Sequence, residues 1–223
     1  MTIKIAVTGG IASGKSTVCK LFSEKLKCKY YNCDIIVSKL YNDYVFCLKN
    51  FSRHKFFSSI LDENGLVDKT KLRELIVENP HRLIDISQIV WVELEKLILQ
   101  IMNSEKEKFI IFEVPLLFES GFDKLFDFIV NIESNFKNRV DRSLNSHIDQ
   151  KFFDIFVSQQ VSNEFRKCHA DFTIFNNGDV QSLDVKINNL INILNDKFLH
   201  NFSSYLVNDI SNLTQNDNNS NAE

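Results

Sequence analysis

A run of glycine, lysine and hydroxyl side chains near the start of the chain is spaced for binding phosphate. Residues 9–17 read GGIASGKST and fit the pattern G-x-x-x-x-G-K-[ST] of a P-loop. In such a loop, backbone N–H groups and the positive end of the following helix hold phosphate oxygens. Lys15 would reach the β- and γ-phosphates, and the Ser16 hydroxyl could ligate Mg²⁺. The residues expected to bind a nucleotide are Gly9, Gly10, Ala12, Ser13, Gly14, Lys15, Ser16 and Thr17.

Four further side chains lie at or after the ends of predicted strands, and the carboxyl ends of parallel strands gather ligands around one cleft. Asp34 could accept a proton from an attacking hydroxyl, but as a residue that opens a helix it could equally be an N-cap. Glu113 stands where many P-loop proteins place a magnesium-linked carboxylate, although a charge at a strand end is also commonplace. Arg139 and Arg142 are three apart on one predicted helix face, which could clamp a phosphoryl group or simply be solvated.

The hydrophobic pattern predicts the elements that must position these residues. Apolar runs of the kind found in a covered parallel sheet occur at residues 3–8, 29–33, 109–114, 128–132 and 172–175. A helix is expected behind the P-loop, another over residues 183–194, and a helical insertion between residues 34 and about 100. Asp68 and Thr70 can cap a helix that runs to Val77, and Asn79-Pro80 is expected to start the next one with Asn79 as its N-cap. The prediction is an α/β fold with a doubly wound five-stranded parallel sheet.

Composition limits the kinds of partner. The chain has 223 residues and a formal charge of −3, which argues against a broad electrostatic grip on nucleic acid. The longest apolar stretch is too short for a membrane span and no leader pattern begins the chain, so we expect a cytoplasmic protein that uses no membrane. The five cysteines are expected to be reduced, without zinc or disulfides. The spacing of Phe202, Leu206, Ile210 and Leu213 could extend a helix, and residues 214–223 are expected to be a disordered tail.

Several motifs together resemble the dephospho-coenzyme A kinase family. They occur in order over about residues 3–195 and are TGGIASGKST (8–17), Asp34, GLVD (65–68) with Leu72 and Arg73, EVPLLFE (113–119), Gln160 with Arg166, and ADFTIFNNG (170–178). The P-loop is shared with many nucleotide kinases. The VPLLFE segment and the NNG ending are much more particular to this family.

The resemblance implies phosphorylation of the ribose 3′-hydroxyl of dephospho-coenzyme A by ATP with Mg²⁺, the last step of coenzyme A synthesis. It implies a nucleotide-binding core at residues 1–33 and 105–200, a helical acceptor domain at 34–104 and a helical lid at 135–165. The implied roles are catalysis by Lys15, Asp34, Arg139 and Arg142, adenine contact by Asn177, acceptor binding by Asp34, Leu116, Leu117 and Glu119, and magnesium binding by Ser16 and Glu113.

Three departures from the family pattern leave other functions open. Asn32-Cys33-Asp34 replaces Asp-Ala-Asp, Gln88-Ile89 replaces a His-Pro pair, and the lid arginines are three rather than four apart. A kinase for another nucleoside or nucleotide would use the same core, and a non-catalytic nucleotide-binding protein could retain it. A guanine-nucleotide switch would need an N-K-x-D signature, which the sequence does not contain. The sequence does not address oligomeric state.

Overall fold

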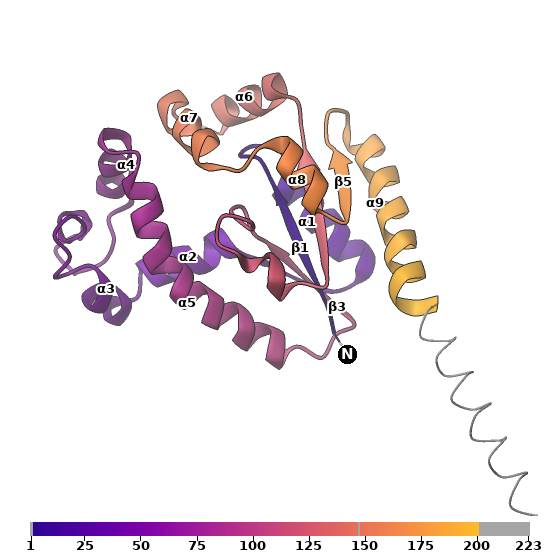
Figure 1. Cartoon of the computed structure of the whole chain (residues 1–223), viewed down its shortest axis with the longest axis horizontal. Helices are drawn as coiled ribbons and strands as arrows, with labels where there is room; N and C mark the ends of the chain where they lie inside the picture. Colours follow the sequence, from indigo (N-terminus) through magenta and orange to yellow (C-terminus); the bar gives the residue numbers. More distant parts are fainter. Residues whose placement is uncertain (1, 147, 201–223) are drawn as a thin grey trace, which may run out of the picture. The chain divides into compact units, whose positions relative to one another are not determined.

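The structure is a computed structural model that describes residues 2–146 and 148–200 (Figure 1). It divides into two compact units, of which the first ends at Asp179. The strands are β1 (Ile3–Gly9), β2 (Lys29–Asn32), β3 (Phe109–Glu113), β4 (Phe128–Glu133) and β5 (Phe172–Phe175). The α-helices described are α1 (Lys15–Leu26), α2 (Cys33–Tyr41), α3 (Tyr44–Asn50), α4 (Lys69–Glu78), α5 (Arg82–Ser104), α6 (Phe136–Asn145), α7 (Gln150–Gln159), α8 (Asn163–His169) and α9 (Val180–Asn195).

The five strands form one parallel sheet in the order β2-β3-β1-β4-β5. Each predicted strand is present, and its ends differ from the predicted ones by at most one residue. The central strand β1 pairs with β3 on one side and β4 on the other. The strands before and after this point are therefore added on opposite sides of β1, and the strand order reverses there. The predicted doubly wound α/β fold is confirmed. In such a sheet the crevice for ligands opens beyond the carboxyl ends of the strands at this reversal, directly after Gly9.

Helices cover both faces of the sheet. Ile110 and Phe112 of β3 belong to a core cluster with Leu94 and Ile98 of α5. Because side chains alternate between the faces of a strand, the residues between them point to the other face. There α1 packs against β1, β2 and β3 and buries Phe22 completely. The P-loop therefore stands between a buried strand and a buried helix, which limits how far its backbone can move.

The helical insertion between β2 and β3 has a core of its own. Phe51 and Phe57 are fully buried, with ring centroids 6.0 Å apart in an edge-to-face pair. Phe46 makes a second edge-to-face contact with Phe51 at 5.5 Å. Aromatic pairs in this geometry add stabilisation beyond their buried area. Helix α5 contributes residues to this cluster near its start and to the sheet core near its end, so one rigid helix joins the insertion to the sheet (Figure 1).

The helix start signals of the insertion are borne out at one place and wrong at another. Asp68 caps α4, because its side chain accepts hydrogen bonds from the backbone N–H groups of Thr70 and Lys71. Asn79 is not the N-cap of α5. Its backbone N–H donates to the Leu75 carbonyl, which makes Asn79 the C-cap of α4, and α5 begins only after a turn, at Arg82. Asparagine suits both helix ends, and the sequence pattern alone did not distinguish them.

The second unit contains α9, whose buried residues Leu183, Ile187, Leu190 and Leu194 recur at helical spacing as predicted. The predicted helix extension from Phe202 and the tail at 214–223 lie outside the described residues. All five cysteines are free thiols. Within the described part of the chain, no helix is long and apolar enough to cross a membrane.

Candidate active site

The P-loop joins β1 to α1 through backbone conformations that require glycine. Gly9 has φ of 145°, and a Cβ atom there would lie 2.2 Å from the carbonyl oxygen of Ile132. Gly14 forms the N-cap of α1 with φ of 94°, again in the region that glycine adopts without strain. The loop closes with a hydrogen bond from the Ser13 N–H to the Gly10 carbonyl at 3.1 Å. The motif thus has the strand-loop-helix context that its phosphate chemistry needs.

Lys15 is buried at the centre of this loop. Its side chain is 8% exposed, and Nζ donates hydrogen bonds to the carbonyl oxygens of Gly9 and Gly10 at 3.1 and 3.0 Å. Burial lowers the pKa of Lys15, while the nearby carboxylates of Glu113 and Asp34 oppose that shift. Anionic phosphate oxygens would supply the negative charge that a buried ammonium group needs.

The carboxylate of Glu113 lies against the P-loop, because β3 is the sheet neighbour of β1. The Ser16 hydroxyl donates to Glu113 Oε1 at 2.8 Å, and the Asn32 side-chain amide donates to Oε2 at 2.7 Å. The Tyr30 hydroxyl also donates to Oε2. Glu113 is only 3% exposed, so these donors balance a buried charge. An aspartate in place of Asn32 would instead set a second carboxylate against Glu113.

The hydroxyl and carboxylate oxygens of Ser16 and Glu113 are the donor types that Mg²⁺ prefers, and such sites complete their coordination with water and nucleotide phosphates. No cluster of three or more His, Cys, Asp or Glu side chains suited to a metal occurs in residues 2–146 and 148–200. The donor set therefore fits a cation held jointly with a nucleotide.

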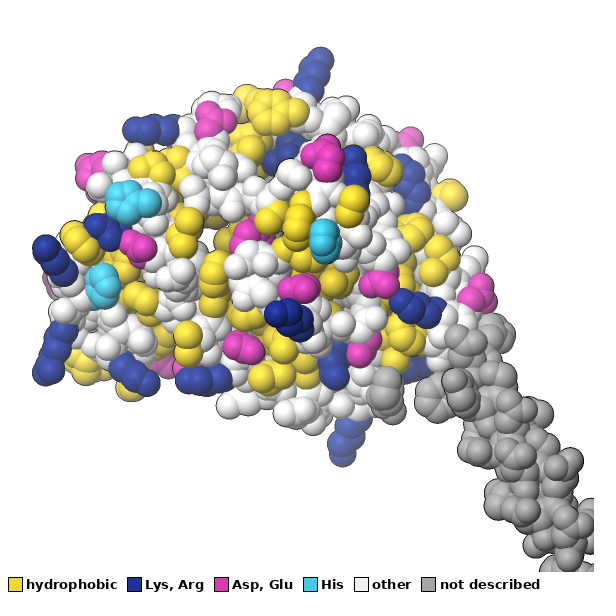
Figure 2. Space-filling model, in the orientation of Figure 1, with side chains coloured by type: hydrophobic (Ala, Val, Ile, Leu, Met, Phe, Trp, Pro, Cys, Tyr) yellow, Lys and Arg dark blue, Asp and Glu magenta, His cyan; other side chains and the backbone are white. Residues whose placement is uncertain are grey.

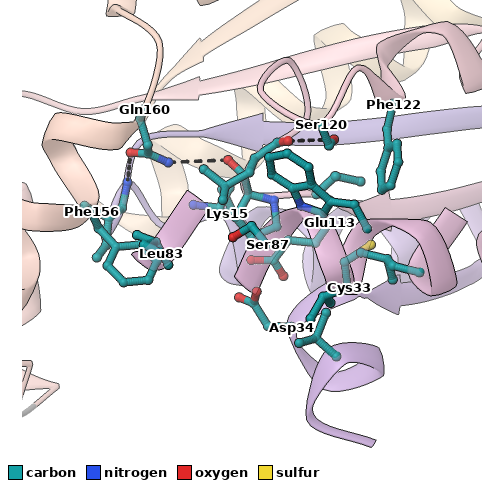
Figure 3. A pocket seen from close by; sticks show the side chains of 18 of the residues that line it. Lys15, Cys33, Asp34, Leu83, Ser87, Glu113, Ser120, Phe122, Phe156 and Gln160 are labelled. Carbon is teal, nitrogen blue, oxygen red and sulfur yellow. Dashed lines mark hydrogen bonds between the residues drawn. The ribbon is translucent and has the colours of Figure 1, made fainter. Parts of the chain in front are cut away.

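Asp34 is in the first turn of α2 but does not cap it. The N-cap is Asn32, whose side-chain oxygen accepts the Ile35 N–H at 3.1 Å. The capping interpretation of Asp34 is therefore wrong, and its carboxylate projects into a cavity beside Lys15 and Glu113 (Figure 3). Desolvation by the cavity walls raises the pKa of Asp34, and the Lys15 ammonium partly offsets this. A carboxylate with a raised pKa is a better proton acceptor than an ordinary aspartate.

The cavity has a volume of about 480 Å³. Its walls come from the P-loop, α2, the first half of α5, the segment after β3 and the end of α7. Figure 3 shows polar groups from three different elements, Lys15, Asp34 and Glu113, meeting on one side of it. Trp91, Leu94 and Phe122 provide an apolar wall. A pocket with a few convergent polar groups and an apolar lining is typical of a small-molecule site.

Arg139 and Arg142 do not form a solvated helix face. Arg139 is 5% exposed, its Nε donates to the Ile11 carbonyl at 2.8 Å, and a Cβ atom on Gly10 would lie 2.7 Å from its guanidinium carbon. Arg142 donates to the carbonyl oxygens of Ser13 and Asn176 at 3.2 and 2.9 Å. Both guanidinium groups of α6 thus lie over the P-loop, where positive charge would stabilise phosphates. Burial lowers the pKa of Arg139.

Not all of the remaining predicted site residues line the cavity. Asn177 accepts hydrogen bonds from the Ser134 hydroxyl and the Asn135 N–H at 3.1 and 2.8 Å, beyond the ends of β4 and β5. Leu116 lines the cavity. Leu117 is instead fully buried in the core cluster, and Glu119 accepts the Val161 N–H at 2.8 Å; neither lines the cavity.

The Gln88-Ile89 pair, which departs from the family pattern, lies within α5. Gln88 is exposed and Ile89 packs against the core of the insertion, so neither side chain lines the 480 Å³ cavity. The preceding residue, Ser87, does line it (Figure 3). The changed pair is therefore one position away along the helix from the side chain that faces the cavity.

Three further polar residues lie at the site although none of them was predicted to be a site residue. The Gln160 amide accepts the Ile11 N–H at 3.0 Å and donates to the Pro115 carbonyl at 3.4 Å (Figure 3). It also donates to the Gly9 carbonyl at 3.5 Å. Asn176 donates to the Ser13 carbonyl at 2.9 Å. Arg166 forms a buried ion pair with Glu133 at 3.4 Å. Gln160 and Arg166 had stood out only as parts of a family motif, since no local spacing indicates partners more than thirty residues away.

The family model and the sequence relatives identify the same family over most of the chain. The family model described as "Dephospho-CoA kinase" matches residues 3–182. A dephospho-CoA kinase of Fusobacterium nucleatum is 35% identical over 184 residues, which cover 82% of this chain and 94% of that protein. One from Ehrlichia canis is 29% identical over 171 residues and covers 75% of this chain and 84% of its own.

Solved structures agree on the fold. A crystal structure from Thermus thermophilus aligns with a TM-score of 0.70 at 22% identity, covering 86% of this chain and 98% of that one. A dephospho-CoA kinase from Campylobacter jejuni aligns with a TM-score of 0.59 at 22% identity, covering 88% and 99%. At this level of identity the structural likeness supports the architecture, and the sequence relatives support the family.

Proposed function

Because this chain belongs to the dephospho-CoA kinase family, we propose that its P-loop cavity transfers the γ-phosphoryl group of ATP to the ribose 3′-hydroxyl of dephospho-coenzyme A. The products are coenzyme A and ADP, and the reaction is the last step of coenzyme A synthesis. The observation that carries the assignment of the site is the meeting of Asp34, Lys15 and the Ser16–Glu113 pair at one cavity. These are a proton acceptor, a phosphate-binding cation and a pair of oxygen ligands, which phosphoryl transfer requires together.

Asp34 is the proposed catalytic base. Its carboxylate would accept the proton of the acceptor 3′-hydroxyl while that oxygen forms a bond to the γ-phosphorus. The bond from the γ-phosphorus to the bridging oxygen breaks, and ADP leaves with the electron pair. The raised pKa of Asp34 favours this role, since the proton must move to the carboxylate near neutral pH.

Lys15, Arg139 and Arg142 would neutralise the charge on the phosphates. To do so they must exchange hydrogen bonds with P-loop carbonyls for bonds to phosphate oxygens. We assign magnesium to Ser16 and Glu113; when bound, the ion would offset negative charge on the β- and γ-phosphates. Asn177 would contact adenine, and Leu116 would line the acceptor side of the cavity.

We assign residues 34–104 as the acceptor domain and 135–165 as a lid over the nucleotide. The support for a lid is that α6 and α7 both approach the loop: α6 supplies the two arginines, and Gln160 at the end of α7 binds the Ile11 N–H. A small-molecule acceptor agrees with the charge distribution, because basic and acidic side chains are interspersed on the face shown in Figure 2. We expect the enzyme to act in the cytoplasm.

The assignment is tested by measuring ADP release from Mg-ATP with dephospho-coenzyme A, adenosine, AMP or no acceptor. We expect turnover with dephospho-coenzyme A alone. Asp34→Asn should lower kcat at least about 100-fold, the contribution of a general base, and leave ATP affinity unchanged. Lys15→Ala controls for a contaminating kinase. Wild-type turnover by Asp34→Asn would show that Asp34 is not the base, whereas turnover with a different acceptor would overturn the substrate assignment.

A further inference from the structure

A second cavity adjoins the first on the side of the helical insertion. Its volume is about 510 Å³, and its lining residues come from α2, α4, α5 and α7. The two cavities have six lining residues in common: Asp34, Val37, Tyr41, Leu83, Ser87 and Phe156. Four of these, Asp34, Leu83, Ser87 and Phe156, are labelled in Figure 3. A molecule whose reacting atom lies at Asp34 can therefore extend from the first cavity into the second without crossing a wall of backbone.

The second cavity has two cationic side chains on α4, Lys69 and Arg73. They are four residues apart and therefore on the same face of the helix. Lys69 Nζ donates to the Ser38 hydroxyl at 2.7 Å, and the Arg73 guanidinium lies 4.8 Å from the ring centroid of Phe152. Among the described residues, neither has a carboxylate within ion-pair distance. The cavity thus contains two positively charged side chains that other residues hold in place and that form no ion pair with any residue that the structure describes.

We propose that Lys69 and Arg73 bind the 5′-diphosphate of the acceptor, an inference that rests on the proposed function. Lys69 is held by Ser38, which lies one helical turn from Asp34 on α2. Residues four apart on a helix have Cβ atoms about 5–6 Å from one another. In the acceptor, the diphosphate is joined to the ribose ring through a single methylene group. If Asp34 holds the 3′-hydroxyl, the diphosphate reaches the neighbourhood of Ser38 and Lys69.

Charge and shape favour placing the diphosphate in the second cavity and the adenine ring in the first, rather than the reverse. A diphosphate beside Asp34 would be repelled by its carboxylate, and two cations in the same cavity offset that repulsion. Lysine binds phosphate as a compact charge and arginine as a planar fork, so the pair suits a diphosphate better than a neutral group. The apolar wall of the first cavity, with Trp91 and Leu94, is left for the adenine ring. Beyond the cations, Leu72, Ile76 and Phe152 line the path for the rest of the acceptor.

The simpler explanation is that Lys69 and Arg73 are ordinary surface charges that contact only water. Lys71 on the same helix provides the comparison, because it lines neither cavity and its Nζ donates to the Leu61 carbonyl at 2.8 Å. If general surface charge attracts the acceptor, removing Lys71 should weaken binding as much as removing Lys69. If the cavity binds the diphosphate, only Lys69 and Arg73 should matter.

The experiment compares Lys69→Gln, Arg73→Gln and the double variant with Lys71→Gln as the matched control. Steady-state kinetics give KM and kcat for dephospho-coenzyme A and KM for ATP. Trp91, the only tryptophan in the chain, lines the first cavity, so its fluorescence can report the binding of dephospho-coenzyme A and of adenosine without turnover. Thermal melting checks that each variant is folded.

We expect each cavity variant to weaken dephospho-coenzyme A binding and raise its KM by about 10- to 100-fold, the range for hydrogen bonds to charged groups. The KM for ATP, the affinity for adenosine and the behaviour of Lys71→Gln should change less than about twofold. Folded variants with unchanged affinity for dephospho-coenzyme A would overturn the inference, as would equal losses for adenosine. Because wild-type turnover tests the proposed function and the titrations test the subsite, the two can fail separately.

Discussion

The Ser16 hydroxyl donates a hydrogen bond to Glu113 Oε1 over 2.8 Å, although 97 positions separate the two residues in the chain. The contact exists because β1 and β3 are adjacent and parallel, with Val7 in register with Glu113. The P-loop that follows β1 and the carboxylate that ends β3 therefore meet at the same edge of the sheet. This relationship makes the two residues a pair whose metal-binding role can be tested together.

Glu113→Gln is expected to raise the magnesium concentration needed for half-maximal activity by about 10- to 100-fold, because it removes the charge that faces the cation. Ser16→Ala should act in the same direction, whereas Ser16→Thr retains a hydroxyl and should remain close to the wild type. The measurement is a magnesium titration at saturating ATP and acceptor. An unchanged magnesium requirement in Glu113→Gln would remove Glu113 from the metal site.

The pH dependence of kcat/KM should have an acid limb set by Asp34. Desolvation raises the pKa of this carboxyl above the ordinary aspartate value of 3.8, and the reaction needs the deprotonated form. Activity should therefore fall as the pH decreases through a value above 3.8. Asp34→Asn should retain little activity and lose this limb. A wild-type profile without an acid limb above pH 3.8 would contradict the raised pKa.

The raised pKa of Asp34 also affects the stability of the folded protein. A carboxyl whose pKa is higher in the folded than in the unfolded state destabilises the protein when ionised, so the penalty is present above the folded pKa and absent below the unfolded one. Asp34→Asn should therefore melt at a higher temperature than the wild type at neutral pH, and the difference should shrink toward pH 3.8. Melting curves across that range provide the test, and a less stable variant at neutral pH would count against it.

Gly10 and Arg139 should be coupled in catalysis. A Cβ atom on Gly10 would lie 2.7 Å from the guanidinium carbon, so Gly10→Ala must displace Arg139. Arg139→Ala is expected to lower kcat by about 10²- to 10³-fold, as for other groups that stabilise transition-state charge. Adding Gly10→Ala to that variant should have little further effect, although Gly10→Ala alone should be impaired. Additive losses in this double-mutant cycle would show that the glycine acts independently of Arg139.

The buried ion pair of Arg166 and Glu133 should stabilise the fold locally rather than act on the substrate. Arg166 is 3% exposed and also donates to the Val161 carbonyl at 2.6 Å, next to Gln160. Glu133→Gln leaves a buried guanidinium without its counter-charge and should lower the free energy of unfolding by about 3 kcal/mol. Lys29→Ala, which breaks the pair between the solvent-exposed Lys29 ammonium and Glu105, should have a much smaller effect. Chemical denaturation measures both, and equal effects would contradict this explanation.

Several parts of this protein could be predicted from local patterns in its sequence. The P-loop could be identified because its glycines, Lys15 and Ser16 lie within nine residues, and the five strands could be placed because buried parallel strands are continuous apolar runs. The capping by Asp68 was equally local, since a cap involves only the next few residues. The family followed from motifs in their order along the chain.

The contacts between residues far apart in the sequence became known from the folded structure. It assigned the N-cap of α2 to Asn32 and so left Asp34 free of that role, and it turned Arg139 and Arg142 toward the P-loop. It revealed Gln160 as a link between the P-loop and Pro115, and it joined Lys69 to Ser38 beside a second cavity. Periodicity reports which face of an element is buried. Which residue that face contacts depends on strand order and helix packing, and no local spacing contains that information.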